Sequence, residues 1–284
     1  MIKEWLDEYK PKNTLEAEQA LREIIQEIAL AGLQRSGFFE KAAFYGGTAL
    51  RIFYNLPRFS EDLDFSLLTP DPDFSLQPYL DGMTKDFEAL GIEITVAEKN
   101  KTSKTKVDSA FLKAGTTWKE LILKDIIPQE RIGIRPDIKI KMEVDTEPPL
   151  GFATEEKLLL KPFSFYVKCF GLPDLFAGKM HALLFRKWKN RVKGRDWFDL
   201  EWYIQKGIPI NLAHLQIRAE ESGDWKEGIL GRDELLKLIE IKINSVSFNN
   251  IREDIVKFIP DAKVLELWSA AYFSDLIKNI KTTT

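Results

Sequence analysis

Apolar residues recur along the chain at the spacings of helices and strands. Over residues 14–36 they repeat on one face, and Asn13 and Glu16 have the spacing of a capping box, so this stretch is predicted to be an amphipathic helix. A second helix is predicted at 77–90. Strands are predicted where apolar and polar residues alternate or cluster: 42–45, 62–68, 92–97, 108–113, 137–145 and 163–170.

The character of the chain changes near residue 171. Strand patterns cluster before that point, and helical patterns dominate from Pro173 to about residue 280, with the first two helices at 173–187 and 195–206. Residues 115–136 are ambiguous, and the Lys-rich stretch 100–106 indicates an exposed turn. We therefore predict an α/β domain, of the α+β kind, over residues 1–170 and a helical domain over 171–284.

Composition restricts the possible class of protein only slightly. With 284 residues, 44% of them hydrophobic, the chain is long enough for two domains with substantial cores. A net charge of −3 gives no global basic field, although residues 186–195 carry six basic side chains in ten. The single cysteine, Cys169, suits a reducing compartment, and no apolar run approaches the length of a membrane span. These features predict a cytoplasmic protein with no membrane partner.

Several common catalytic motifs are missing from the sequence. There is no Walker loop and no GxGxxG, and the two histidines, His181 and His214, lie 33 positions apart. A histidine-rich metal site and a histidine-based triad with a spare histidine are therefore excluded. Chemistry in this chain must depend on carboxylates, lysines, arginines and backbone amides.

Residues 46–64 concentrate the candidate chemistry. Gly46 and Gly47 precede Thr48 at a predicted strand-to-helix turn, where the backbone can approach a ligand and helix N–H groups can bind anionic oxygens. For a glycine pair alone, a purely structural turn is the favoured interpretation. Downstream, Asp62 and Asp64 alternate with large apolar residues in a predicted strand, so both carboxylates lie on one face.

Two carboxylates on one strand face favour a bound cation. At about 6–7 Å they repel each other by roughly 2–3 kcal/mol at an effective dielectric constant of about 20. An exposed, acidic strand end is the alternative interpretation. Glu143 alternates with Met142 and Val144 in another predicted strand and would supply a third carboxylate. Three such groups on adjacent strands would hold Mg²⁺ through oxygen ligands.

Four ordered blocks carry a resemblance to a known superfamily. They are GGTALR, RFSEDLDFSL, the DLFAGKMHAL of residues 174–183, and the KGRDWFDL of residues 193–200, with the apolar–Glu–apolar strand between them. Over residues 40–205 the chain resembles the DNA polymerase β-like nucleotidyltransferases, and within them the AbiEii-type toxins that include the MenT enzymes. One difference is Gly47-Thr48, where many members have Gly-Ser.

The resemblance implies a nucleotidyltransferase fold with a small mixed sheet flanked by helices, and a role for each motif residue. Metal ligands would be Asp62, Asp64 and Glu143. The helical domain would contribute Lys179, as a triphosphate ligand, and a carboxylate from Asp196 or Asp199 to the cleft; a salt bridge from that pair to Arg195 or Lys193 is an equal alternative. Substrate contacts are expected from Gly46, Gly47, Thr48, Arg51, Ser60, Lys141, Arg186 and Arg195.

The implied reaction is transfer of a nucleoside monophosphate from an NTP to an acceptor hydroxyl, with Mg²⁺ or Mn²⁺ as cofactor. The family suggests a tRNA 3′ end as acceptor and a toxin of a type IV toxin–antitoxin or abortive-infection system that forms no stable antitoxin complex. The basic segment 186–195, with Trp188, could contact RNA or could be a solvated helix end. Two alternatives stay open: transfer to a small aminoglycoside-like molecule, and a non-catalytic nucleotide- or RNA-binding protein.

Overall fold

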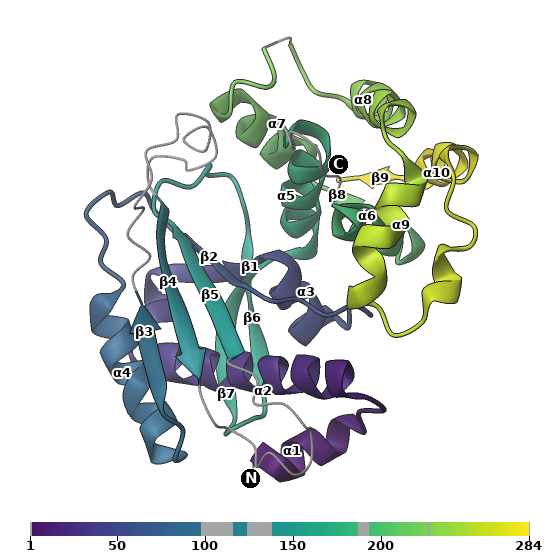
Figure 1. Ribbon diagram of the computed structural model, residues 1–284. Helices are drawn as coiled ribbons and strands as arrows, with labels where there is room; N and C mark the ends of the chain where they lie inside the picture. The colour runs from purple at the N-terminus through teal and green to yellow at the C-terminus, as the bar shows by residue number, and fades with distance from the viewer. Residues whose placement is uncertain (1, 98–115, 124–137, 187–192, 227, 284) are drawn as a thin grey trace, which may run out of the picture. The chain divides into compact units, whose positions relative to one another are not determined.

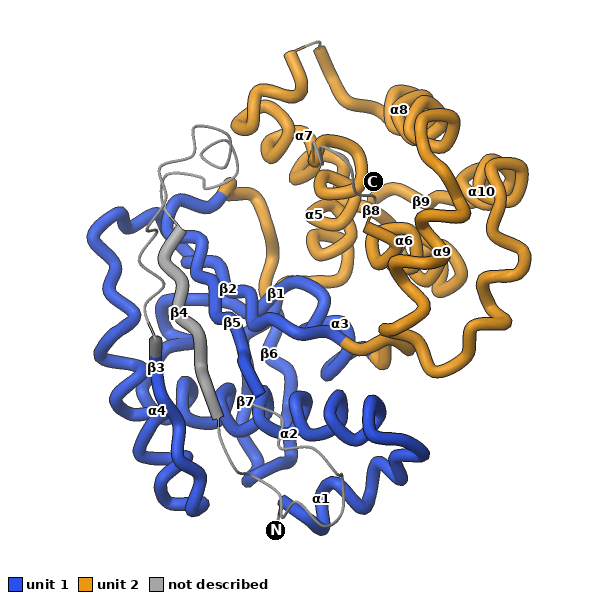
Figure 2. Tube along the Cα trace, in the orientation of Figure 1, with its two compact units in different colours: residues 1–54, 60–148, 155–169 blue, residues 55–59, 149–154, 170–284 orange. Residues whose placement is uncertain are grey.

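The computed structural model describes residues 2–97, 116–123, 138–186, 193–226 and 228–283 (Figure 1). The turn predicted at 100–106, the strand predicted at 108–113 and Trp188 lie outside these residues. The chain forms two compact units (Figure 2). Unit 1 comprises residues 1–54, 60–148 and 155–169, and unit 2 comprises residues 55–59, 149–154 and 170–284.

Unit 1 is built on a seven-stranded mixed sheet with the strand order β3-β4-β5-β2-β1-β7-β6. The strands are β1 (Ala42–Tyr45), β2 (Leu63–Leu67), β3 (Ile94–Ala97), β4 (Thr116–Leu123), β5 (Ile138–Asp145), β6 (Thr154–Leu159) and β7 (Phe165–Phe170). β2 is antiparallel to β1 and parallel to β5, so β2 lies in the interior of the sheet.

Sequence patterns identify the central strands and miss β6. The alternation in DIKIKMEVD becomes β5, whose four apolar side chains are fully buried. β6 has the sequence TEEKLL, with mostly exposed positions, because it is the outermost strand and packs little apolar surface. β4 falls in the stretch that the sequence left ambiguous.

The helices of unit 1 are α1 (Ile2–Tyr9), α2 (Thr14–Arg35), α3 (Gly46–Tyr54) and α4 (Gln77–Ala89), with a short 3₁₀ turn, η1 (Phe38–Glu40). The predicted cap of α2 is present, because Asn13 accepts a hydrogen bond from the Glu16 N–H at 2.9 Å. α2 and α4 lie side by side against the sheet (Figure 1). Ile24, Ile28 and the apolar side of β2 and β5 form the core between them.

Unit 2 is mainly helical. Its helices are α5 (Leu172–Phe185), α6 (Gly194–Gln205), α7 (Leu212–Glu221), α8 (Arg232–Ser245), α9 (Phe248–Ile255) and α10 (Ala270–Leu276), with 3₁₀ turns η3 (Val256–Phe258), η4 (Ala262–Leu265) and η5 (Ile277–Asn279). Two short strands, β8 (Pro209–Ile210) and β9 (Lys281–Thr282), pair in parallel. The fold class is the one predicted, a mixed sheet flanked by helices and followed by a helical part. None of the described helices has the length and apolarity needed to cross a membrane.

Candidate active site

Strands β2 and β5 place two of the predicted carboxylates side by side. They pair in parallel with Leu63 opposite Met142 and Asp64 opposite Glu143. Leu63 and Met142 are fully buried, so Asp64 and Glu143 project together from the other face of the sheet, where both are half-buried. Asp62 directly precedes β2 and is two residues from Asp64. The alternation predicts a common face for Asp62 and Asp64, and the strand register adds Glu143 as the neighbour of Asp64.

Thr48 holds the backbone at Asp62. Its side chain is fully buried, and its hydroxyl donates a hydrogen bond to the Asp62 carbonyl. The side-chain hydroxyl that we expected to contact phosphate therefore positions the carboxylate segment instead. Phosphate binding by the backbone N–H groups at the start of α3, at Gly46 and Gly47, stays a prediction.

Gly46 is needed to make room for Asp64. Its backbone has a φ of +86°, a region that side chains disfavour. A Cβ atom added there would lie 3.1 Å from both Cβ and Cγ of Asp64 and would collide with the carboxylate. The first glycine of the pair thus serves the carboxylate on β2, a role that the sequence alone could not separate from that of a simple turn.

The three carboxylates have the oxygen donors that a divalent magnesium or manganese ion prefers. In the described residues no group of three His, Cys, Asp or Glu side chains is arranged to hold a metal ion. Glu143 instead forms an ion pair with Lys141, two residues away on the same strand face. The residue types therefore fit a divalent cation, and Glu143 would exchange the Lys141 ammonium for it.

Arg51 and Ser60 are tied to helix α2. Arg51, a predicted substrate contact, donates a hydrogen bond from Nε to Glu23 at 2.8 Å, and Glu23 is only 9% exposed. The Ser60 carbonyl accepts a hydrogen bond from Gln26, which is 1% exposed. Polar residues of α2 therefore support the loop that leads to Asp62. Glu23 and Gln26 were not predicted as site residues, because both interrupt an otherwise apolar helix face.

Asp199 is the most buried carboxylate of the candidate set. Within unit 2, its Oδ1 and Oδ2 each accept a hydrogen bond from Arg58 at 2.6 Å, and Oδ2 also lies 2.8 Å from the Lys179 Nζ. Although burial raises the pKa of Asp199, the two cations outweigh burial and hold it below its usual value. The ion-pair partners of Asp199 are thus Arg58 and Lys179, whereas a salt bridge from Asp196 to Arg195 or Lys193 stays a prediction.

Basic side chains gather near the start of α6. Burial, followed by the nearby cations Arg186, Arg195 and Lys179, lowers the pKa of Lys193 to about 8, against the opposing effect of Asp196. Arg186 is exposed, whereas Arg195 lies 4.2 Å from the Phe258 ring centroid. Lys193 is a candidate anion contact that the sequence analysis did not select. Its only signal there is its place in a basic run.

Other residues of the recognised blocks hold unit 2 together. The Gly194 N–H donates to Asp254 at 3.0 Å, and a Cβ at Gly194 would lie 2.8 Å from that of Ile255, so α6 and α9 pack in close contact. Asp174 is 3% exposed and accepts hydrogen bonds from the Ala153 N–H and the Asn211 side chain. These two positions are explained by packing and need no ligand.

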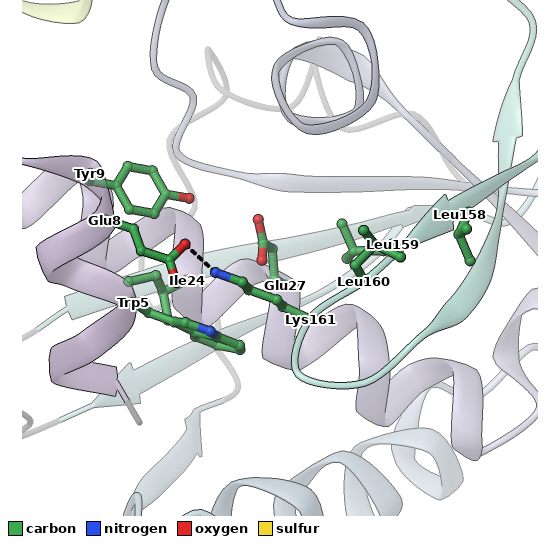
Figure 3. A pocket seen from close by; sticks show the side chains of 9 residues that line it. All are labelled: Trp5, Glu8, Tyr9, Ile24, Glu27, Leu158, Leu159, Leu160 and Lys161. Carbon is green, nitrogen blue, oxygen red and sulfur yellow. Dashed lines mark hydrogen bonds and ion pairs between the residues drawn. The ribbon is translucent and has the colours of Figure 1, made fainter.

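A separate pocket of about 440 Å³ lies between α1, α2 and the end of β6 (Figure 3). Trp5, Tyr9 and Leu160 are among its lining residues, and Lys161 reaches across it to pair with Glu8. The pocket contains none of the residues that the sequence motifs select.

The fold of this chain is similar to that of solved structures. MenT4, a nucleotidyltransferase toxin from Mycobacterium tuberculosis H37Rv, superposes with a TM-score of 0.59 at 16% identity, covering 96% of this chain and 87% of that one. JHP933 from Helicobacter pylori is more distant, with a TM-score of 0.44, 16% identity and coverage of 89% and 90%. A comparison with curated proteins gives no match.

The fold is therefore that of a nucleotidyltransferase. Residues 28–283 match the family described as the nucleotidyl transferase AbiEii toxin of type IV toxin–antitoxin systems. The chain belongs to this family, which confirms the resemblance seen in the motifs, and it is an NTP-dependent nucleotidyltransferase.

Proposed function

We propose that this toxin transfers a nucleoside monophosphate from an NTP to the 3′ hydroxyl of a tRNA, with a divalent cation held by Asp62, Asp64 and Glu143. The observation that carries the proposal is the register of β2 and β5, which sets Asp64 beside Glu143 on the exposed face of buried strands. Mg²⁺, or Mn²⁺ in its place, would orient the phosphates and favour ionisation of the acceptor hydroxyl.

The chain's own side chains have distinct roles in this reaction. The acceptor oxygen attacks the α-phosphorus, the bond to the bridging oxygen breaks, and pyrophosphate leaves. Glu143 helps to remove the hydroxyl proton, for which a half-buried carboxylate is chemically suited. The Lys179 ammonium balances the charge of the triphosphate. Asp199, fully buried between two cations, serves to hold Lys179 and is not proposed as a base.

A nucleic acid acceptor is consistent with the basic side chains near α6. Arg186, Lys193 and Arg195 come from one short stretch, and each could bind a backbone phosphate. Blocking a tRNA 3′ end would prevent aminoacylation, which accounts for toxicity. We expect no stable complex with an antitoxin.

Replacing the strand carboxylates tests the metal role. Asp62→Ala and Asp64→Ala should each reduce nucleotide transfer by at least about a hundredfold, the scale of losing a preorganised electrostatic group. Folding should change little, because both side chains are only half-buried. Glu156→Ala, which removes an exposed carboxylate from the outermost strand β6, is the matched control and should retain full activity. Near-normal transfer by both aspartate variants would disprove the proposed site.

The acceptor is identified by labelling. The protein is incubated with each α-labelled NTP, Mg²⁺ and total RNA, and the labelled species are separated by size. We expect label in the tRNA band, with the signal lost when the tRNA 3′ hydroxyl is oxidised beforehand. Label found instead on an added aminoglycoside would contradict the tRNA assignment, and absence of label from every acceptor would contradict transfer itself.

A further inference from the structure

A buried carboxylate shared by two cations lies in unit 2. Arg58 donates hydrogen bonds to Asp199 from Nε and Nη2, and Lys179 forms an ion pair with the same carboxylate. The Arg58 and Asp199 side chains are 1% and 0% exposed, whereas that of Lys179 is 17% exposed. The two-pronged Arg58 contact is the geometry in which a guanidinium binds a carboxylate most strongly.

The charges of this group do not cancel. Two cations and one anion leave a net charge of +1, and Lys179 is the only member with appreciable access to solvent. An ammonium has three N–H donors, and Asp199 is the single acceptor recorded for Lys179 in the part of the chain that the structure describes. The surplus positive charge is thus directed outward through the lysine.

We propose that Arg58 is a positioning residue that reserves the charge of Lys179 for an anionic ligand, namely the triphosphate of the substrate. The role of the ligand rests on the proposed transfer reaction, whereas the charge arrangement does not. By satisfying both oxygens of Asp199, Arg58 lets that carboxylate orient Lys179 without neutralising it. If Arg58 were absent, Asp199 and Lys179 would form a closed pair with no net charge.

Arg58 is itself held firmly in unit 2. Its Nη1 donates to the Phe59 carbonyl at 3.0 Å, and the Phe59 N–H donates to the Phe258 carbonyl at 2.9 Å. These contacts fix the position of the guanidinium that binds Asp199.

Binding of magnesium tripolyphosphate, which has the charge of the substrate without its base, tests the inference by calorimetry. Arg58→Met should weaken binding by at least about tenfold, the value of one charge-assisted hydrogen bond. The double variant Arg58→Met/Asp199→Asn has the +1 charge again and should bind more tightly than Arg58→Met. A purely structural ion pair predicts no such order: the folded fractions of the wild-type, single-variant and double-variant proteins would bind tripolyphosphate equally, and the three would differ in stability alone.

Controls separate folding and catalysis from this effect. Thermal unfolding identifies the folded fraction of each variant, and Arg58→Lys, which keeps the charge, should bind better than Arg58→Met. In transfer assays the change should appear in KM for the NTP more than in kcat. Unchanged binding by Arg58→Met, or a double variant no tighter than the single one, would overturn the inference. Tripolyphosphate binding in the expected order, without transfer by the wild-type protein, would overturn the proposed function alone.

Discussion

At the scale of single residues, the candidate site depends on the contacts that Gly46 and Thr48 make with the segment carrying the two aspartates. Gly46 adopts a positive φ, and the space that its missing side chain leaves is filled by the Asp64 carboxylate. Thr48 is buried, and its hydroxyl donates a hydrogen bond to the Asp62 carbonyl. The residues of the GGT motif therefore act on the two aspartates directly, by removing a clash and by adding a hydrogen bond.

Gly46→Ala tests this arrangement. The added methyl group should displace the Asp64 carboxylate and reduce nucleotide transfer by at least about tenfold, because catalytic groups must be held closely in place. Gly91→Ala is the matched control, since Gly91 also has a positive φ but a Cβ there meets no atom within 4 Å. Both variants should lose about 1–2 kcal/mol of stability from backbone strain. Equal activities of the two would show that the contact with Asp64 is unimportant.

At the scale of elements, helix α2 carries polar residues that connect it to its surroundings. Glu23 binds Arg51 and the Tyr9 hydroxyl, and Gln26 binds the Ser60 carbonyl. Glu27 lies in the pocket beside α1 (Figure 3), where burial and then the nearby Glu23 raise its pKa to about 8, against the pull of Lys161. A carboxyl group in such a place prefers to keep its proton.

The raised pKa of Glu27 makes stability dependent on pH. The folded protein binds this proton up to about pH 8, whereas the unfolded chain releases it near 4.5, so its contribution to stability is lost as pH rises between these values. Glu27→Gln should therefore raise the unfolding temperature at about pH 8.5 by roughly 2–4 °C for each kcal/mol recovered. At about pH 4 it should have little effect.

Calorimetric unfolding at both pH values provides the measurement. Glu18→Gln is the control on the same helix, because the Glu18 side chain is 38% exposed and pairs with Arg22 at the surface. A Glu27→Gln protein that unfolds with the wild-type pH dependence would show that the pocket does not hold this proton.

At the scale of the whole molecule, the protein has a net charge of −3, yet several basic side chains lie close together near the start of α6. Lys179, Arg186 and Arg195 are each close enough to Lys193 to influence it electrostatically. All four lie in unit 2 with the buried Arg58–Asp199 pair. Local charge, more than total charge, decides where a phosphate binds. Nucleotide and RNA affinity should therefore fall steeply with salt.

Lys193 provides a test that depends on pH. Its pKa is lowered from 10.5 to about 8, first by burial and then by neighbouring cations, so much of it is neutral near pH 8. A bound phosphate would raise this pKa again, and nucleotide binding near that pH should take up a proton. Calorimetry in buffers of different ionisation enthalpy measures this uptake. Above about pH 8 the affinity should decrease.

Lys193→Arg is the matched variant, because a guanidinium stays protonated throughout this range. It should bind nucleotide without proton uptake and with a flatter pH profile. The same uptake in both proteins would assign the proton to another group. Since the folded protein releases this proton before the unfolded chain does, wild-type stability should also rise between pH 8 and 10.5, and the variant should lack that rise.

The sequence by itself determined the features that are encoded locally. Alternation of Leu63 and Phe65 with Asp64 placed this carboxylate on the strand face opposite the buried side chains, because strand periodicity assigns every second side chain to the same side. The strand of Glu143 was predicted from the same periodicity, and the cap at Asn13 from its spacing to Glu16. The edge strand β6 was missed because few of its positions are buried.

Only the tertiary structure decided which residues, distant in the sequence, form buried ion pairs. Arg58 and Asp199 are 141 residues apart, and no periodicity links them. Burial makes an unpaired charge costly, so each of these two side chains needs a partner of opposite charge. The packing of α5 and α6 with residues 55–59 determines which partner it has. In the same way, the neighbour of Asp64 follows from strand order, and the need for glycine at position 46 follows from where that carboxylate lies.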